Sequence, residues 1–357
     1  MPTNQTKDEG NDDQVYWAFA AMSAAENGFP APPSTNPSWL AMAQAVFNEQ
    51  AARWDTSTCG GGLRWQIFTF NSGYTYKNVP SNGGFMNLAA RLARYTGNAT
   101  YTEWAEKSWN WLADSVLYDN KTFSIWDGTS DVANCTDAEH IFWSYNYGAI
   151  LSGLANLYNL TEDASYLPAI NGILDACFTN FFPEKYGNKI MVEAACQPLG
   201  TCDTDQYAFK GITIRMLVVV SQLVPSTAAT IWPYIQASAQ GAAGQCIGGA
   251  DGKTCGFEWN STTYDGLYGV GEQLSALAVI GANMVNIDNS LKAPLTSNTG
   301  GTSKSNPSAG TSTNTDSLLP SIVTKKMTTA DKAGAAIVTI LVLGGTLAGA
   351  AWMVLFD

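Results

Sequence analysis

Residues 144–158 of this 357-residue chain read SYNYGAILSGLANLY, a stretch with apolar side chains on nearly every face of a helix. Apolar residues recurring every three or four positions indicate a helix, and a helix that is apolar all round is expected to be buried on every side. The pattern recurs about every sixty residues. Five such inner helices are predicted, at residues 13–27, 84–95, 144–158, 207–223 and 269–284.

Amphipathic helices with one wet face alternate with the buried ones. In residues 38–54 the apolar stripe contains Trp39, Phe47 and Trp54, whereas Arg53 faces away. Inner and outer helices in alternation predict an all-α fold, the (α/α)6 toroid, whose mouth is lined by the loops that lead into the inner helices. The outer helices are predicted at residues 38–54, 101–117, 164–178 and about 231–242.

These nine helices are three fewer than the twelve of a six-pair ring, and the missing three would precede Asp13. No signal peptide opens the chain, because MPTNQTKDEGNDD is polar throughout. We therefore expect an N-terminally incomplete ring, and we hypothesise that the natural N-terminus lies upstream of Met1. An open helical array that is complete as it stands, like an α-solenoid, is the alternative.

The composition divides the chain into three parts. Residues 1–290 form the predicted folded domain. Residues 291–332 form a Ser/Thr-rich linker: 12 of the 22 residues from Thr296 to Ser317 are Ser or Thr. Such a segment cannot bury enough apolar surface to fold, so we expect a disordered, O-glycosylated stalk. Residues 333–357 form a hydrophobic tail, expected to be helical.

The tail is uncharged from Ala333 to Phe356, which is long enough to cross a bilayer. Only Asp357 follows, whereas a retained span is usually followed by cytosolic Lys or Arg. We therefore favour a glycosylphosphatidylinositol (GPI) signal over a retained span, with the attachment site between Ser317 and Thr329. Both alternatives predict a membrane partner and a secretory route to the cell surface, at the plasma membrane or cell wall.

Cysteines and glycosylation sequons favour the same compartment. The chain has seven Cys and six Asn-x-Ser/Thr sequons. Cys177 lies on an apolar helix stripe, which favours a buried free thiol. The sequence leaves the pairing of Cys59, Cys135 and Cys177 open, with Cys59–Cys135 preferred. Short loops also favour the bridges Cys196–Cys202 and Cys246–Cys255.

Charge and histidine content exclude other classes. Eighteen Lys+Arg against 30 Asp+Glu give a net charge of −12, which argues against a nucleic-acid partner. The single His140 excludes multi-histidine zinc sites and is read as structural. No metal site and no cofactor are predicted, although Asp203 and Asp205 are weaker candidates for calcium ligands.

Asp12 and Asp13 stand at the head of the first inner helix, at its predicted N-cap and first helical positions. Aspartates commonly only cap a helix there. This helix is apolar all round, however, so its end is expected to open into the mouth. Adjacent carboxylates repel, which raises the pKa of one, while the helix dipole keeps the other ionised. With carboxyl groups about 5 to 6 Å apart, the pair is predicted to act as a retaining glycosidase.

Aromatic and amide side chains recur at the heads of the other inner helices, in segments such as FWSYNYG and DTDQYAFKG. Flat rings together with hydrogen-bonding amides are typical of sugar sites, although a core role for each ring is the alternative. The predicted substrate-binding residues are Asn82, Tyr145, Asn146, Asp205, Gln206 and Lys210.

Six motifs carry a family resemblance: NDDQVYWAFAAMSAAE, CGGGLRWQI, SNGGFMNLAARLARYTGN, WSYNYG, DQYAFKG and GVGEQLSAL. In this order, over residues 1–284, they resemble glycoside hydrolase family 76, in particular its fungal mannan endo-1,6-alpha-mannosidases. The resemblance implies a six-pair toroid preceded by a signal peptide. It also implies retaining action on alpha-1,6-linked mannose, with Asp12 as nucleophile and Asp13 as acid/base. It further implies lipid-anchored transglycosidases that move the glycan of anchored wall proteins to wall glucan.

Two functions therefore compete. The favoured one is an endo-acting retaining alpha-1,6-mannosidase or transglycosidase acting on mannan or GPI-linked glycans, with wall glucan as a possible acceptor. Hydrolysis and transfer share one covalent intermediate, so the sequence does not separate them. The rival is a non-catalytic wall-glycan binding or scaffolding protein, in which the Asp pair only caps its helix and the truncated toroid is inactive.

Overall fold

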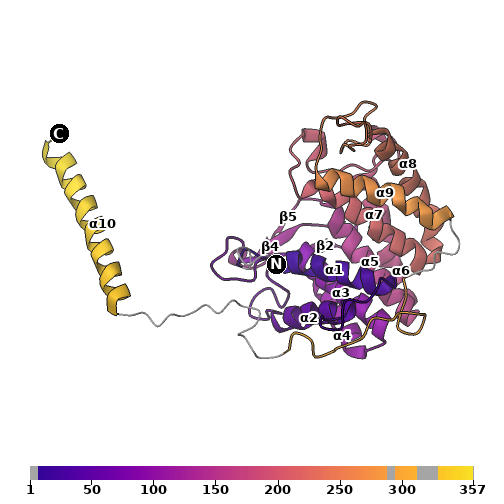
Figure 1. Ribbon diagram of the computed structural model, residues 1–357, viewed down its shortest axis with the longest axis horizontal. Coiled ribbons are helices and arrows are strands. Elements are labelled where there is room, and N and C mark those ends of the chain that lie inside the picture. The colour runs from indigo at the N-terminus through magenta and orange to yellow at the C-terminus, as the bar shows by residue number, and fades with distance from the viewer. Residues whose placement is uncertain (1–6, 288–293, 312–328, 357) are drawn as a thin grey trace. The chain divides into compact units, whose positions relative to one another are not determined.

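The computed structural model describes residues 7–287, 294–311 and 329–356. It has two units, and residues Lys7–Thr311 form the larger one. There the nine predicted helices are present, alternating along the chain (Figure 1). The inner helices are α1 Asn11–Glu26, α3 Val79–Thr96, α5 Ser144–Thr161, α7 Gln206–Leu223 and α9 Val270–Ile287, and the outer helices are α2 Trp39–Ala52, α4 Ala99–Asp114, α6 Leu167–Phe181 and α8 Ala228–Gly244.

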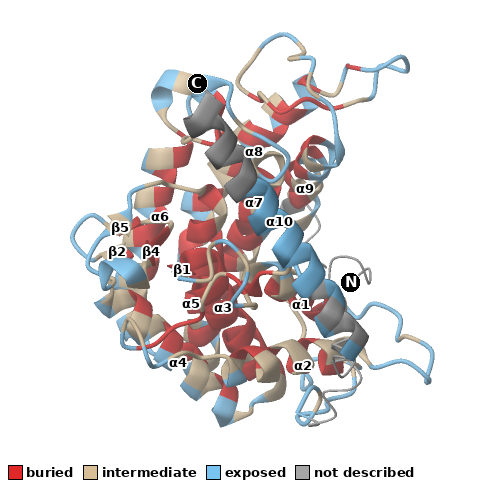
Figure 2. Ribbon diagram, turned by 90° about the vertical axis from the view of Figure 1, so that its left-hand side faces the viewer, coloured by how far each residue is buried: buried red, intermediate tan, exposed pale blue. Residues whose placement is uncertain are grey.

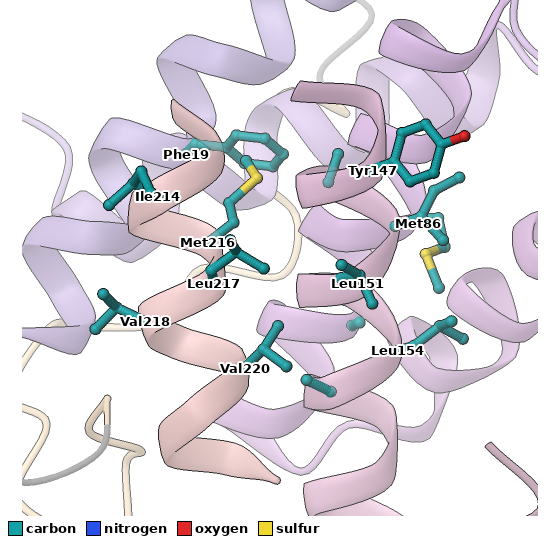
Figure 3. Close-up of a cluster of buried hydrophobic side chains, with 14 of the residues drawn as sticks. Phe19, Met86, Tyr147, Leu151, Leu154, Ile214, Met216, Leu217, Val218 and Val220 are labelled. Carbon is teal, nitrogen blue, oxygen red and sulfur yellow. The ribbon is translucent and has the colours of Figure 1, made fainter. Parts of the chain in front are cut away.

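The inner helices pack side by side in chain order, and each contributes to one apolar core. Between α5 and α7, Leu151 lies opposite Leu217 and Val220, and all three are buried (Figure 3). This packing confirms that the helices read as apolar all round are inner ones.

Glycines set how closely neighbouring inner helices approach. A Cβ added to Gly84 of α3 would lie 2.6 Å from the Val15 side chain of α1, and one added to Gly211 of α7 would lie 2.7 Å from the Ser275 backbone of α9. Both separations are too short for real atoms. The second inner helix, predicted to begin at residue 84, begins earlier in the structure, at Val79.

The row of inner helices has two ends, α1 and α9, in the described part of the chain. A groove of about 460 Å³ is lined by α1, α7 and α9, so a closed six-pair ring is not observed there. As expected for end helices, apolar side chains are left exposed: Trp17 of α1, and Val270 and Leu277 of α9.

Short strands brace the loops at one end of the inner helices. β1 Tyr76–Asn78, β4 Gly128–Ser130 and β5 Ala138–Glu139 form an antiparallel sheet in the order β1-β4-β5, with Tyr76 opposite Ser130 and Gly128 opposite Glu139. β1 leads directly into α3. A hairpin of β2 Tyr118–Asp119 and β3 Ser124–Ile125 lies nearby in sequence. In Figure 2 the inner helices are mainly buried, whereas loops at the ends are mainly exposed.

The expected disorder of residues 296–311 is wrong. Residues 294–311, here called the strap, follow the outside of α2. The Leu40 amide donates to Ser303 Oγ at 2.9 Å, the Asn306 amide donates to Gln44 Oε1 at 2.6 Å, and Asn48 Nδ2 donates to the Ala309 carbonyl at 2.8 Å. The strap needs no core of its own, because polar groups of α2 satisfy its backbone and hydroxyls. Residues 312–317 of the expected stalk lie outside the described residues.

The expected disulfides are present. Cys59 pairs with Cys135, Cys196 with Cys202, and Cys246 with Cys255. Cys177 is a buried free thiol on α6, as its position on the apolar stripe indicated.

The second unit contains one helix, α10 Thr329–Phe356. Its apolar described stretch runs from Ala336 to Thr346. Among the described residues, no single helix has both the length and the hydropathy needed to cross a membrane. One bent pair of helices, α7 with α8, has that length and composition when the two are taken together.

Candidate active site

Asp12 and Asp13 lie in the first turn of α1, at its mouth end. The helix begins at Asn11, so the aspartates occupy its second and third positions rather than the expected N-cap and first positions. Tertiary contacts move the start: the Asn11 amide donates to the Trp65 carbonyl at 2.8 Å, and Asn11 Nδ2 donates to the Arg64 carbonyl at 2.8 Å. The cap residue is Gly10, whose amide donates to Asp13 Oδ2 at 2.7 Å.

Gly10 also shows how close the two carboxylates are. A Cβ added to this glycine would lie 2.2 Å from Asp12 Oδ1 and 3.1 Å from Asp13 Oδ2. These oxygens therefore cannot be farther apart than the sum of the two distances, about 5.3 Å. Retaining glycosidases hold their carboxyl groups about 5–5.5 Å apart, and inverting ones about 6.5–9.5 Å. The closeness of the pair fits the retaining geometry.

The pair is half-buried at Asp12 and exposed at Asp13. Burial, and then repulsion from Asp13, raises the pKa of Asp12 to about 7. Burial, and then repulsion from Asp205, raises the pKa of Asp13, although the hydrogen bond from Gly10 opposes the rise. Both carboxyl groups therefore keep a proton to higher pH than a solvated aspartate does.

A line of aromatic rings leads away from the pair. The hydroxyl of Tyr16, one helical turn along α1, is buried and has no hydrogen-bond partner among the described residues, and its pKa is raised by burial and by Asp12. The Tyr16 ring lies 6.1 Å from that of Tyr145, which stacks on Phe209 at 3.9 Å. Tyr145, predicted to bind substrate, therefore lies on the ring-lined side of the pair.

A second acidic group near the pair was not predicted. The Asp127 carbonyl accepts the Val79 amide at 2.8 Å, beside Asn78, whose side chain bonds Asp12. Tyr76 Oη lies 3.0 Å from Asp127 Oδ2 and 2.9 Å from Glu139 Oε2. A phenol has one hydrogen, so it can donate to only one of them.

The second carboxyl group must therefore hold a proton to bond the tyrosine. Burial raises the pKa of Asp127, which makes a proton on this carboxyl group more favourable than on a solvated aspartate. The position of Asp127 ahead of α5 could have suggested it as a site residue. Its contacts could not be predicted, because no local sequence pattern indicates which residues lie beside it. Tyr16 could have been found from its spacing of three and four residues from the Asp pair.

Two predicted substrate-binding residues are used by the scaffold instead. Asn82 is fully buried: its Oδ1 accepts the Leu63 amide at 2.6 Å and its Nδ2 donates to the Leu63 carbonyl at 2.9 Å. Lys210 is also fully buried, and its Nζ donates to the Phe257 carbonyl at 2.5 Å and lies 4.2 Å from the Trp259 ring centre. Neither side chain is accessible to a sugar.

The remaining predicted residues are near the mouth. Asn146 is buried, and its Nδ2 lies 3.4 Å from Asp127 Oδ1, while its Oδ1 has no hydrogen-bond partner in the part of the chain that the structure describes. Asp205 is exposed immediately before α7, and its charge acts on Asp13. Gln206 Oε1 accepts the Asp203 amide at 2.7 Å. Within the described ranges, no group of three or more His, Cys, Asp or Glu side chains is placed to hold a metal ion.

Alternating inner and outer helices with a close carboxylate pair at the mouth are features of the α/α class of carbohydrate-active enzymes. The model of glycosyl hydrolase family 76 matches residues 1–298, and the chain belongs to this family.

Relatives in this family are fungal enzymes. The chain is 47% identical over 355 residues to the mannan endo-1,6-alpha-mannosidase DFG5 of Saccharomyces cerevisiae, an alignment that covers 99% of this chain and 76% of that protein. It is 44% identical to the mannan endo-1,6-alpha-mannosidase DCW1 of Candida albicans, covering 99% of this chain and 77% of that protein.

Solved structures agree in fold. The crystal structure of Dfg5 from Chaetomium thermophilum in complex with glucosamine has a TM-score of 0.82 and 41% identity, and the match covers 87% of this chain and 76% of that one. An alpha-1,6-mannanase of Salegentibacter has a TM-score of 0.64 at 18% identity, covering 79% and 78%. That mannanase is an inactive variant, with two consecutive aspartates replaced by asparagine, in complex with alpha-1,6-mannotriose.

Proposed function

We propose that this chain is an endo-acting retaining alpha-1,6-mannosidase or transglycosidase of the fungal cell wall. The observation that carries the proposal is the carboxylate pair Asp12 and Asp13 with oxygens within about 5.3 Å, at the head of an inner helix. Its relatives named mannan endo-1,6-alpha-mannosidases supply the substrate class. Mannan or a GPI-linked glycan is the donor, and wall glucan or water is the acceptor.

In the proposed reaction one aspartate, as the carboxylate, attacks the anomeric carbon, and the other, as the carboxylic acid, gives its proton to the leaving oxygen. Water or a sugar hydroxyl then releases the covalent mannosyl intermediate, with the second carboxyl group acting as base. Family resemblance gives attack to Asp12 and proton transfer to Asp13. Asp12 has to be ionised when it attacks, and because its pKa is raised to about 7 in the free protein, any proton on it has to leave first.

Trapping and substitution test the reaction and the roles together. A 2-fluoro-mannosyl donor slows release of the covalent intermediate, so the adduct accumulates. Peptide mass spectrometry should find it on Asp12. Asp12→Asn should lower kcat on alpha-1,6-mannan at least about 10³-fold while mannan still binds. Asp175→Asn, an exposed aspartate on α6, is the control. Full activity of Asp12→Asn would refute the proposal, and an adduct on Asp13 would exchange the roles.

We further propose that the protein is a glycoprotein of the secretory pathway, held at the plasma membrane or wall through its C-terminal tail. The uncharged tail and the sequons support this location. A GPI signal is favoured over a retained span. Release of the protein from membranes by a phosphatidylinositol-specific phospholipase would support the GPI anchor, and resistance with retention of the tail would favour the span.

The non-catalytic alternative is less well supported. A protein that only binds wall glycans has no use for two carboxylates whose pKa values are both raised by burial and repulsion. The relatives are also named as enzymes.

A further inference from the structure

A hollow of about 470 Å³ lies between the loops that lead into α5 and α7. One wall is residues 140–143, directly before α5. The other is residues 194–203, held by the Cys196–Cys202 bridge before α7. Its volume falls within the range of small-ligand sites.

The hollow and the Asp pair belong to one mouth. Trp143 of the hollow packs edge-on against Phe209 at 5.6 Å, and Phe209 stacks on Tyr145, which neighbours Tyr16 beside Asp12. A second link runs through Asp205. It acts on Asp13 and directly precedes Gln206, which lines the hollow.

Three aromatic rings, those of His140, Phe142 and Trp143, line the wall before α5. His140 and Phe142 both pack against Trp126, at 4.3 and 4.6 Å, so these two rings are held by a third behind them. His140 is exposed, whereas Phe142 and Trp143 are half-buried. Ring faces of this kind offer an apolar surface to the C–H face of a pyranose.

The opposite wall supplies hydrogen-bonding groups without positive charge. Gln206 Oε1 is used by the Asp203 amide, and in the described part of the chain its Nε2 makes no hydrogen bond, so both amide hydrogens can be donated. The Asp203 carboxylate can accept hydroxyls. The lining contains no Lys or Arg. A phosphate or other anion would meet no counter-charge there, whereas a neutral polyhydroxyl ligand would be matched.

We propose that this hollow is a subsite for a hexopyranose unit of the alpha-1,6-mannan chain, at least one unit away from the bond that is cleaved. The inference rests on the proposed function, because the ligand is the remote part of the same substrate. Binding energy from the remote unit would orient the scissile bond over Asp12 and Asp13. His140, read from the sequence as purely structural, becomes part of the sugar-binding wall.

The single histidine of the chain provides a direct test. In protein labelled on histidine, the imidazole C–H resonances report on one position, His140. An alpha-1,6-mannohexaose is added at constant pH to the full chain carrying Asp12→Asn and Asp13→Asn, so that it is not consumed. The His140 resonances should shift saturably, and Gln206→Ala should weaken that saturation several-fold. Binding measured by calorimetry with unmoved His140 resonances would overturn the subsite.

Substrate length gives a second test in the active chain. In this test kcat/KM is measured for the hexamannoside and for the shortest oligosaccharide that is cleaved. Trp143→Ala should lower the ratio of the first value to the second by at least about ten-fold. Leu199→Ala is the matched control, because Leu199 lies on the same disulfide loop but is 74% exposed and outside the hollow. An unchanged ratio overturns the proposal. If Trp143→Ala does not fold, the same ratio is measured for Gln206→Ala and decides in its place.

Failure of the two proposals looks different. If the wild-type chain neither binds nor cleaves alpha-1,6-mannosides of any length, the proposed function itself fails. If it cleaves them and neither variant changes the length dependence, only the subsite fails.

Discussion

The middle inner helices and the end ones differ in what covers them. In α3, every residue except Arg94 and Thr96 is buried. In α9 the pattern is as apolar, yet Val270 is 86% exposed and Leu277 is 68% exposed. α3 has an inner neighbour on both sides, whereas α9 has α7 on one side only.

The difference shows that the apolar pattern of a helix and its actual burial are separate properties. An all-round apolar helix specifies that every face has to be covered, but burial follows the neighbours that are present. At the end helix α1, polar contacts rather than a second inner neighbour hold the mouth end in place. Its Glu26 end is also tied down, because Arg91 Nη2 of α3 lies 2.5 Å from Glu26 Oε2 in a buried ion pair.

The largest contrast is expected from the same substitution in a middle helix and an end helix. Leu151→Ala in α5 should lower the free energy of unfolding by about 3 kcal/mol, because it leaves a cavity in a fully buried site. Leu277→Ala in α9 should change it by less than about 0.5 kcal/mol. Urea denaturation of both variants measures the difference. An equal loss at Leu277 would break the comparison, since α9 would then be covered in the intact protein.

A smaller effect is expected at the mouth end of α1. Burial raises the pKa of Asp12 from its ordinary 3.8 to about 7, so between these values the folded state holds a proton that the unfolded state has lost. The stability due to this group is therefore present at low pH and is lost as the pH rises from about 4 to about 7. Asp12→Asn should remove this loss.

The gain at pH 7.5 should be about 1 to 2 kcal/mol relative to wild type, allowing for solvent screening. The measurement is the thermal or urea stability of both proteins across this pH range. Asp175→Asn on the exposed side of α6 should leave the pH slope unchanged. Identical slopes for wild type and Asp12→Asn would show that Asp12 is solvated like a surface residue.

The smallest effect is expected for the strap. This segment covers part of the end pair of helices, α1 and α2. Ser303→Ala removes the acceptor of the Leu40 amide and should cost about 1 kcal/mol. Ser308→Ala, an exposed strap position, is the control. Faster proteolysis within the strap of the Ser303 variant should accompany the loss. No change in either measurement would mean that the strap contributes nothing to holding α2.

Helices were predictable and the strap was not. Each of the nine helices repeats its apolar residues every three or four positions, a signal contained in the helix itself. The strap has the composition of disordered chains. It is ordered because Gln44 and Asn48 of α2, more than 250 residues earlier, accept and donate its hydrogen bonds.

The candidate site divides in the same way. The Asp pair could be located from its place before an apolar run, and its spacing follows from adjacency. Lys210 and Asn82 were equally plausible from sequence as sugar ligands, but the fold uses both of them internally. The contacts of Tyr76 Oη with Asp127 and Glu139 bring together three separate segments of the chain, which no local sequence pattern indicates.

By itself the sequence determined the helices, the disulfide pairs in short loops and the position of two carboxylates at a helix head, because each depends on residues close together in the chain. Only the tertiary structure decided which polar groups are free to meet a ligand and that the pKa values of both aspartates are raised. Those properties depend on burial and on partners such as Asn78 for Asp12 and Asp205 for Asp13, which the chain brings from 66 and 192 positions away.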